Sequence, residues 1–158
     1  MRYRSCIAAA VVILSLAGGM PVGYAVPAAV GVTVALTPTQ QVAPGATFEV
    51  YLDVTEAGSA FNAFDAYIGF DPAALTYVSG SNLEGSYMTD ACGNTFSMFK
   101  SVASTLTIND ALMCGGMALS GPGRLYRVRF QASMTPQRTA VEFLPGLQFY
   151  NAGLYVNP

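Results

Sequence analysis

Apolar and polar residues alternate along most of the chain from residue 31 onward. The segment FEVYLDV (48–54) has an apolar side chain at every second position, and NAFDAYIGF (62–70) and RLYRVRFQASM (124–134) repeat this pattern. A period of two is typical of a β-strand with one buried face. Further short strands are predicted at GVTVAL (31–36), LTYVS (75–79), TFSMFKSVA (95–103), STLTINDALM (104–113), TAVEFL (139–144) and LQFYNAGLYV (147–156).

Turn residues separate these runs, and no segment has the period of a convincing amphipathic helix. Pro44-Gly45 and SGPG (120–123) are turn signals, and GSNLEGSYMTDACGN (80–94) is polar and glycine-containing, which predicts a long loop. Many short strands with turn signals about every 8 to 12 residues favour an all-β sandwich. The part of the chain that follows residue 25 is long enough to bury a core as one domain.

The first 25 residues have the three parts of a secretory signal peptide. Arg2 and Arg4 form a basic start, CIAAAVVILSLAGGM (6–20) is an uncharged apolar run, and PVGYA (21–25) ends in small residues. We expect cleavage after Ala25, which leaves 26–158 as a single secreted or cell-surface domain. The alternative is an uncleaved anchor helix, but the apolar run is shorter than the roughly 20 residues that a membrane span needs. No membrane span is therefore expected in the mature chain.

Charge and cysteine usage narrow the function further. Nine acidic and seven basic residues give a formal net charge of −2, so no basic patch can neutralise phosphates and nucleic acid is not an expected partner. Once Cys6 is removed with the leader, Cys92 and Cys114 remain. In an exported chain such a pair is typical of a disulfide. Two buried free thiols are the alternative.

The residues needed for most enzyme sites are missing. The chain has no histidine, which excludes Ser-His-Asp and Cys-His catalysis and histidine-ligated metal sites. The carboxylates show no spacing that would pair two of them as in a glycosidase. We therefore expect no catalytic activity and no cofactor. Calcium is the one weak alternative, because hard oxygen ligands lie near the two cysteines at Asp90, Asn94, Asn109 and Asp110.

The stretch FDPAAL (70–75) predicts a capped turn between two strands rather than a catalytic carboxylate. Asp71 before Pro72 can accept a backbone N–H two residues on, and the fixed φ of Pro72 suits the first position of a helical turn. Leu75 would then enter the core. The role that we expect for Asp71 and Pro72 is therefore structural.

Three segments resemble cohesin domains. AYIGFDPAALTYVSGS (66–81) is similar to their strand, Asp-Pro turn and following strand, and QVAPGATFEVYLDV (41–54) to their Pro-Gly turn and second strand. SGPGRLYRVRF (120–130) resembles their late strand, and the order and spacing fit over about residues 32 to 156. The resemblance implies a jelly-roll sandwich of about nine strands, related to cellulose-binding modules, with a non-catalytic extracellular role in holding a dockerin module.

The resemblance also indicates where a partner would bind. In many cohesins the strand before Asp-Pro carries an Asn and an Asp that face the partner. The Asp position falls on Asp65 here, whereas the Asn position is occupied by Ala63. We expect a sheet face that presents Asp65 and Tyr67, together with Thr107 and Asn109 of an adjoining strand, to an extracellular protein partner.

Two other functions stay open. Polysaccharide binding by stacking needs exposed aromatic rings; the chain has no Trp, but Tyr51 and Tyr67 fall on predicted outward faces and could form a small platform. A structural or adhesin domain in a surface assembly is the other alternative.

Overall fold

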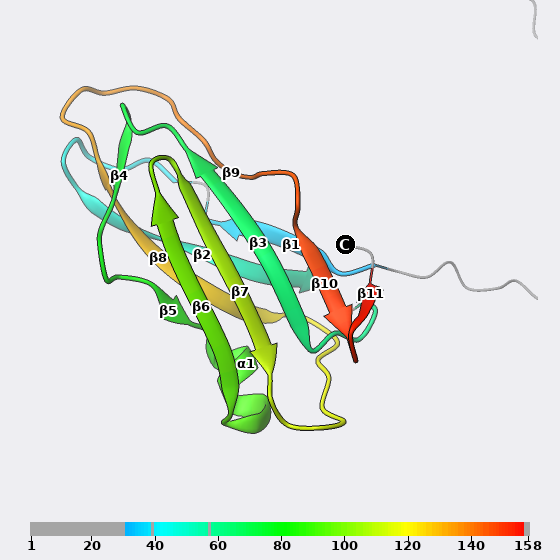
Figure 1. Cartoon of the computed structure of the whole chain (residues 1–158). Helices are drawn as coiled ribbons and strands as arrows, with labels where there is room; N and C mark the ends of the chain where they lie inside the picture. The colour runs from blue at the N-terminus through cyan, green and yellow to red at the C-terminus, as the bar shows by residue number, and fades with distance from the viewer. Residues whose placement is uncertain (1–30, 39, 57, 157–158) are drawn as a thin grey trace, which may run out of the picture.

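Two antiparallel sheets pack face to face in the computed structural model, which describes residues 31–38, 40–56 and 58–156 (Figure 1). The first sheet has the order β1-β2-β8-β4, and β5 also pairs with β8. The second has the order β11-β10-β3-β7-β6, and β9 also pairs with β3. The bounds are β1 Thr33–Thr37, β2 Thr47–Glu56, β3 Ala63–Phe70, β4 Leu75–Tyr77, β5 Leu83–Glu84, β6 Thr95–Val102, β7 Thr105–Leu112, β8 Gly123–Ala132, β9 Val141–Phe143, β10 Gln148–Asn151 and β11 Leu154–Val156.

The all-β sandwich predicted from the alternation is confirmed. The described residues contain eleven strands rather than about nine, because very short segments such as β5 and β9 also pair with longer strands. The alternate apolar residues of β2, β3 and β8 point between the sheets and are buried there. Aromatic rings from both sheets meet in this core: Phe70 of β3 lies edge-on to Phe130 of β8, with ring centroids 5.0 Å apart.

The Asp-Pro turn has the predicted capping contact. The Asp71 carboxylate accepts the backbone N–H of Ala73 at 2.9 Å, and the Asp71 carbonyl accepts that of Leu75 at 2.9 Å. Leu75 is buried at the start of β4. The side chain of Asp71 therefore shapes the chain reversal between the two sheets.

The segment 80–94 is not the long loop that its composition predicts, because it contains β5 and the short helix α1 (Ser86–Cys92). Met88 is the one fully buried residue of α1, and Gly93 ends the helix with a left-handed φ of 66°. A helix of two turns with one apolar anchor has too short a pattern to be recognised in the sequence.

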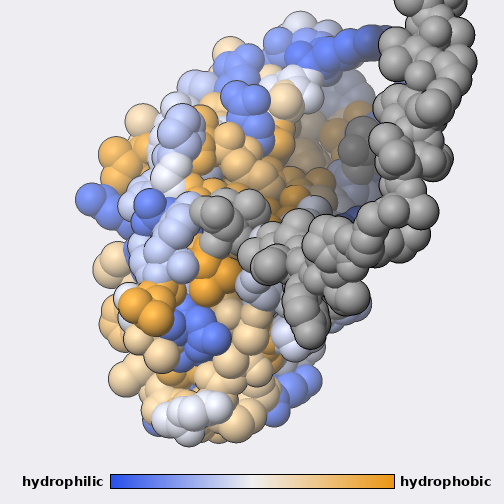
Figure 2. Space-filling view, turned by 90° about the vertical axis from the view of Figure 1, so that its right-hand side faces the viewer, coloured by the Kyte–Doolittle hydropathy of each residue, from blue (hydrophilic) through white to orange (hydrophobic). Residues whose placement is uncertain are grey.

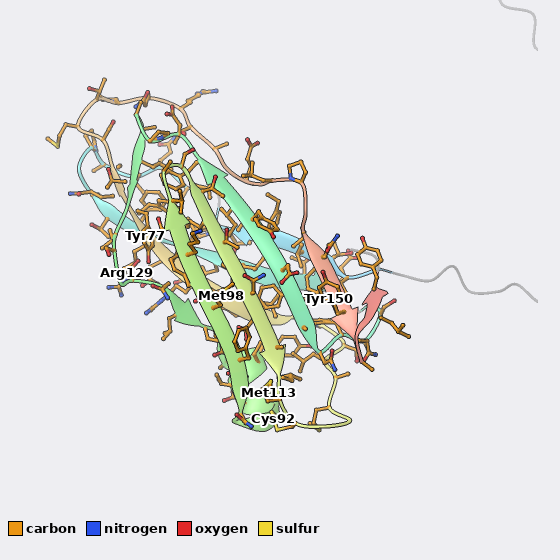
Figure 3. All side chains as sticks on the ribbon, viewed as in Figure 1. Tyr77, Cys92, Met98, Met113, Arg129 and Tyr150 are labelled. Carbon is orange, nitrogen blue, oxygen red and sulfur yellow. A yellow bond between two sulfur atoms is a disulfide. The ribbon has the colours of Figure 1, made fainter. Side chains whose placement is uncertain are left out.

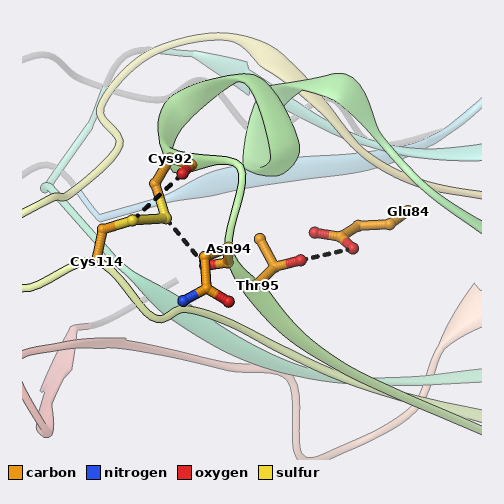
Figure 4. Close-up of a disulfide and its surroundings, with 5 residues drawn as sticks. All are labelled: Glu84, Cys92, Asn94, Thr95 and Cys114. Atoms are coloured by element: carbon orange, nitrogen blue, oxygen red, sulfur yellow. Dashed lines mark hydrogen bonds between the residues drawn. A yellow bond between two sulfur atoms is a disulfide. The ribbon is translucent and has the colours of Figure 1, made fainter.

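The predicted disulfide joins Cys92, at the end of α1, to Cys114, in the loop after β7 (Figure 4). The two Cα atoms are 6.0 Å apart, within the usual range for a disulfide. The bond therefore attaches α1 to the second sheet.

One corner of the interior is polar. We call it the inner polar corner and define it by Glu84, Thr95, Ser97, Asp110 and Tyr126, from β5, β6, β7 and β8; Ser97, on the edge strand, is exposed and marks its solvent side. Asp110 is only 2% exposed and is the one fully buried charged or polar residue among those described. Burial, followed by the nearby Glu84 charge, raises the pKa of Asp110 to about 7, and the Ala111 amide opposes this shift.

In the part of the chain that the structure describes, no helix is long and apolar enough to cross a membrane. The expected signal peptide, residues 1–25, lies outside the described residues.

Candidate functional site

The four predicted binding residues lie together on the outer face of the second sheet, the side of β10, β3, β7 and β6 that points away from the first sheet. Asp65 is directly opposite Asn109, and Tyr67 is directly opposite Thr107, in the antiparallel pairing of β3 with β7. All four are half-buried. The register therefore places them in one compact block, although nothing in the fold by itself assigns them a partner.

A hydrogen-bonded polar group, which we call the polar centre, fixes Asp65 on this face. Asn109 donates its side-chain N–H to Asp65 Oδ1, and the Tyr150 hydroxyl of β10 donates to Asp65 Oδ2 at 3.0 Å. The same hydroxyl lies beside the Gln148 side-chain oxygen. Desolvation, together with the Asp65 carboxylate, raises the pKa of Tyr150. Both oxygens of Asp65 are thus engaged, so the carboxylate has a defined orientation.

Tyr67 is held from the side by the loop between β9 and β10. The Leu144 N–H donates to the Tyr67 carbonyl at 2.8 Å. Gly146, with a φ of +112°, lies against the Tyr67 ring: a Cβ there would be 3.0 Å from ring carbons. This loop packing leaves less of the ring free than an outward strand position suggests.

The edge strand β6 carries exposed apolar residues on the outer face that its sequence pattern did not predict there. Phe96, Met98 and Val102 are 52%, 48% and 55% exposed, and we call them the apolar row. They are opposite Ala111, Asn109 and Thr105 of β7 and so share the face of the polar centre; Figure 3 labels Met98 on β6 and Tyr150 on β10.

The signal for the apolar row was present in TFSMFKSVA, because Thr95, Ser97 and Ser101 alternate with the apolar residues. The usual rule for a strand with one buried face would turn Phe96, Met98 and Val102 toward the interior. The structure turns the other set toward the first sheet: Phe99 packs against the core, Thr95 hydrogen-bonds to Glu84, and Ser97 on the same side stays exposed.

On the opposite edge of the same sheet, β11 adds further exposed apolar surface. Leu154 and Tyr155 are both exposed, and Tyr155 contacts Tyr150 edge-on with ring centroids 6.4 Å apart. Figure 2 views the molecule from this side and shows hydrophobic residues exposed among hydrophilic ones. The polar centre thus has apolar residues on both sides.

The outer face of the first sheet has a different character, because its charges neutralise one another. Hydrogen bonds from Tyr51 and Arg129 lower the pKa of Glu49. The Arg124 guanidinium lies 3.5 Å above the centre of the Tyr51 ring and covers it. The ion pairs of this face are Arg124–Asp53 at 3.0 Å, Arg127–Glu49 at 3.1 Å and Arg129–Glu49 at 2.8 Å.

The tyrosine platform expected for sugar binding does not form. Tyr51 is on β2 of the first sheet and Tyr67 is on β3 of the second, so their side chains lie on opposite outer faces of the sandwich. Alternation along a strand tells which residues share a face, but it does not tell which sheet the strand joins.

The structure also separates the four calcium candidates. Asp90 and Asn94 are exposed near α1. Asn109 and Asp110 are consecutive on β7, so one points to the outer face and the other into the sandwich. Among the described residues, no group of three or more Cys, Asp or Glu side chains could hold a metal ion.

Comparisons with known proteins give one consistent result. A family model described as "Cohesin domain" matches residues 32–154. No curated protein sequence matches the chain at a significant level. Similar solved structures include a non-cellulosomal cohesin from Archaeoglobus fulgidus, 17% identical, which covers 73% of this chain and 75% of that one with a TM-score of 0.56.

Two further similar structures are complexes. The sixth cohesin of Acetivibrio cellulolyticus scaffoldin B, in complex with a Cel5 dockerin mutant, is 15% identical and covers 80% of this chain and 92% of its own, with a TM-score of 0.65. The Clostridium thermocellum Coh-OlpA–Doc918 cohesin–dockerin complex contributes a chain that is 12% identical, with coverages of 81% and 92% and a TM-score of 0.65. At these identities the similarity shows the fold alone.

Proposed function

The chain belongs to the cohesin family, whose domains are non-catalytic binding modules, and on this premise we propose that it binds a dockerin module through the outer face of the second sheet. Two of the similar solved structures are described as complexes of a cohesin with a dockerin. The observation that carries the proposal is the apolar row of β6 lying beside the polar centre on one sheet face.

This arrangement has the composition of a protein–protein interface. Interfaces combine apolar and aromatic anchors, which lose water on binding, with oriented polar groups that choose the partner. Phe96 and Met98 would supply the anchors, and the fixed carboxylate of Asp65 would supply the oriented acceptor. The outer face of the first sheet, by contrast, presents ion pairs that are already satisfied.

Position 63 differs from the family pattern at one point of the sheet face. This difference would change which dockerin is selected and leave the rest of the binding surface as it is. Ala63, which replaces the Asn expected from the family pattern, is opposite Tyr150 on β10 and Ala111 on β7. At this position a partner would therefore contact the Tyr150 ring and the Ala63 methyl group instead of the amide of an Asn side chain. We infer that this cohesin selects a dockerin whose contact residue at that place is apolar or aromatic.

Binding to a panel of dockerin modules, measured by titration calorimetry, tests the proposal. Met98→Asp puts a charge into the apolar row and should weaken binding at least about tenfold, because a buried interface would have to desolvate it. Thr47→Asp is the matched control: it adds the same charge at an exposed strand position on the first sheet. Wild-type affinity in Met98→Asp together with lost affinity in Thr47→Asp would assign binding to the other face.

Polysaccharide binding has less support, since Arg124 covers Tyr51 and the loop at Gly146 packs on Tyr67. A glycan array would reveal it, and sugar binding abolished by Tyr67→Ala would replace the dockerin proposal. A panel without any binder, protein or sugar, would favour the structural role.

We also propose that the domain acts outside the cell. The sequence of residues 1–25 and the Cys92–Cys114 disulfide support export, since disulfides persist in oxidising compartments. N-terminal sequencing of the protein recovered from culture medium or cell surface should begin at Val26. Recovery from the reducing cytoplasm with Met1 intact would contradict export.

A further inference from the structure

The inner polar corner contains two carboxylates from opposite sheets. Glu84 of β5 is opposite Tyr126 of β8, and Asp110 of β7 is opposite Ser97 of β6, so all four side chains lie on inward-facing positions. Glu84 also accepts the hydroxyl of Thr95, two residues before Ser97 on β6, so it lies near Asp110 across the two sheets, and its charge raises the pKa of Asp110.

These carboxylates have almost no hydrogen-bond donors. Glu84 Oε2 accepts the Thr95 hydroxyl at 2.9 Å, as Figure 4 shows, but Glu84 Oε1 is buried without a partner. Both oxygens of Asp110 are also buried, and the neighbouring Ala111 amide, although it lowers the pKa of Asp110, does not have the geometry of a hydrogen bond to either oxygen. Three buried acceptor atoms without donors are costly in a protein interior.

No positive side chain compensates for this charge in the described residues. The ion pairs there all use Glu49 or Asp53 on the outer face of the first sheet. Lys100, the only lysine of the chain, points outward on β6. When both carboxylates are ionised, as at pH 8, no described residue therefore supplies their counter-charge.

We propose that Glu84 and Asp110 bind a calcium ion inside the sandwich, with hydroxyl oxygens of Thr95 and Ser97 and water completing the shell. Every polar group available is a hard oxygen ligand, and calcium accepts six to eight such ligands in flexible geometry, whereas magnesium demands a near-ideal octahedron. Nitrogen and thiolate ligands, which softer metals prefer, are absent there: the chain has no histidine, and Cys92 and Cys114 are joined.

The same site accounts for the polar side chain of Thr95 on the inward side of β6. Thr95 and Ser97 share the inward side of β6 with Phe99, whose ring stacks on Tyr126, and Ser97 is exposed at this edge of the sandwich. Ser97 hydrogen-bonds to the Tyr126 hydroxyl, which also accepts the Asn82 amide at 3.3 Å. Four strands thus supply oxygen atoms to the inner polar corner.

Thermal unfolding of the purified chain without any partner tests the site. After chelation, added calcium at pH 8 should raise the Tm by an amount that keeps growing with the logarithm of its concentration, and magnesium at equal ionic strength should raise it far less. Terbium should bind with tyrosine-sensitised luminescence, Tyr126 being adjacent, and calcium should quench that signal by displacement.

Substitutions of the two carboxylates test whether calcium binds at this site or elsewhere on the protein. Asp110→Asn keeps the shape, removes a buried charge and should still fold, but should lose the calcium-dependent rise in Tm and the terbium signal, and Glu84→Gln should do the same. Asp90→Asn, an exposed neighbour on α1, should respond as the wild type does. A wild type whose Tm ignores calcium, or an Asp110→Asn variant that responds equally, would overturn the proposal. Both results would leave the dockerin proposal untouched, since no partner is present.

Discussion

Asp110 makes the metal-free protein less stable as the pH rises, and Asp110→Asn isolates this effect. The pKa of Asp110 is about 7 in the fold against an ordinary value of 3.8. The native state therefore binds the proton more tightly than the unfolded chain. The stabilising contribution is fully present below about pH 4, is lost as the pH rises toward 7, and stays absent above that.

The magnitude follows from the size of the shift. About three pH units at roughly 1.4 kcal/mol each give a loss of about 4 kcal/mol between pH 4 and pH 8. Two titratable groups face Asp110: Glu84 repels its charge, and Tyr126, whose pKa burial raises above its ordinary 10.0, stays protonated throughout. The loss of stability between pH 4 and pH 8 therefore comes mainly from the ionisation of Asp110.

Urea unfolding followed by circular dichroism, in the presence of a chelator from pH 4 to pH 8, measures this contribution. The free energy of unfolding of Asp110→Asn minus that of the wild type should increase across the range by up to about 4 kcal/mol, because the amide cannot ionise. Asp90→Asn, at an exposed position on α1, is the matched control for removing a carboxylate. A difference for Asp110→Asn that is flat with pH would refute the reasoning, because the native and unfolded states would then bind the proton equally.

Two further predictions concern the region around α1. Replacing both Cys92 and Cys114 by Ser should lower the free energy of unfolding by about 3 kcal/mol, given the sequence separation of 22 residues, and an unchanged urea midpoint would show that the bond adds nothing. Gly85→Ala places a Cβ 2.0 Å from the Arg124 carbonyl oxygen and should lower the free energy of unfolding by more than about 2 kcal/mol. Gly115→Ala is the control: its Cβ would have no atom within 4 Å, so the free energy of unfolding should change by no more than about 0.5 kcal/mol. Equal urea midpoints for the two variants would contradict the close approach at Gly85.

The sequence was sufficient to predict those parts of the fold that depend only on the residue pattern of one segment. The alternation in β2, β3 and β8 identified their buried sides, and Asp71 behaves as the turn chemistry requires. The segment 80–94 was not predictable in the same way. Its strand β5 is two residues long and its helix α1 has one buried residue, so both exist because of contacts with β8 rather than because of their own pattern.

The sequence predicted the features of the candidate site that follow from the pattern of a single strand. It did not predict the features that depend on which strands pair. Asp65 and Asn109 could be proposed as neighbours because each falls on a polar position of its own strand, and β3 pairs with β7 in that register. Which sheet Tyr51 joins, and which way β6 turns its two sets of residues, depend on long-range pairing that a strand's own pattern does not contain. Glu84 was missed for the same reason, since only its pairing with Tyr126 directs it inward.

Strand β6 has one more consequence, for the behaviour of the molecule in solution. It is the last strand of its sheet, so one side of its backbone has no neighbouring strand within residues 31–38, 40–56 and 58–156, and it carries the exposed Phe96, Met98 and Val102. An exposed hydrophobic edge strand invites another chain to extend the sheet, and lysine is a common deterrent. Here a single ammonium group, that of Lys100, interrupts the row, so at high concentration an unoccupied domain would rely on one cation to prevent edge-to-edge aggregation.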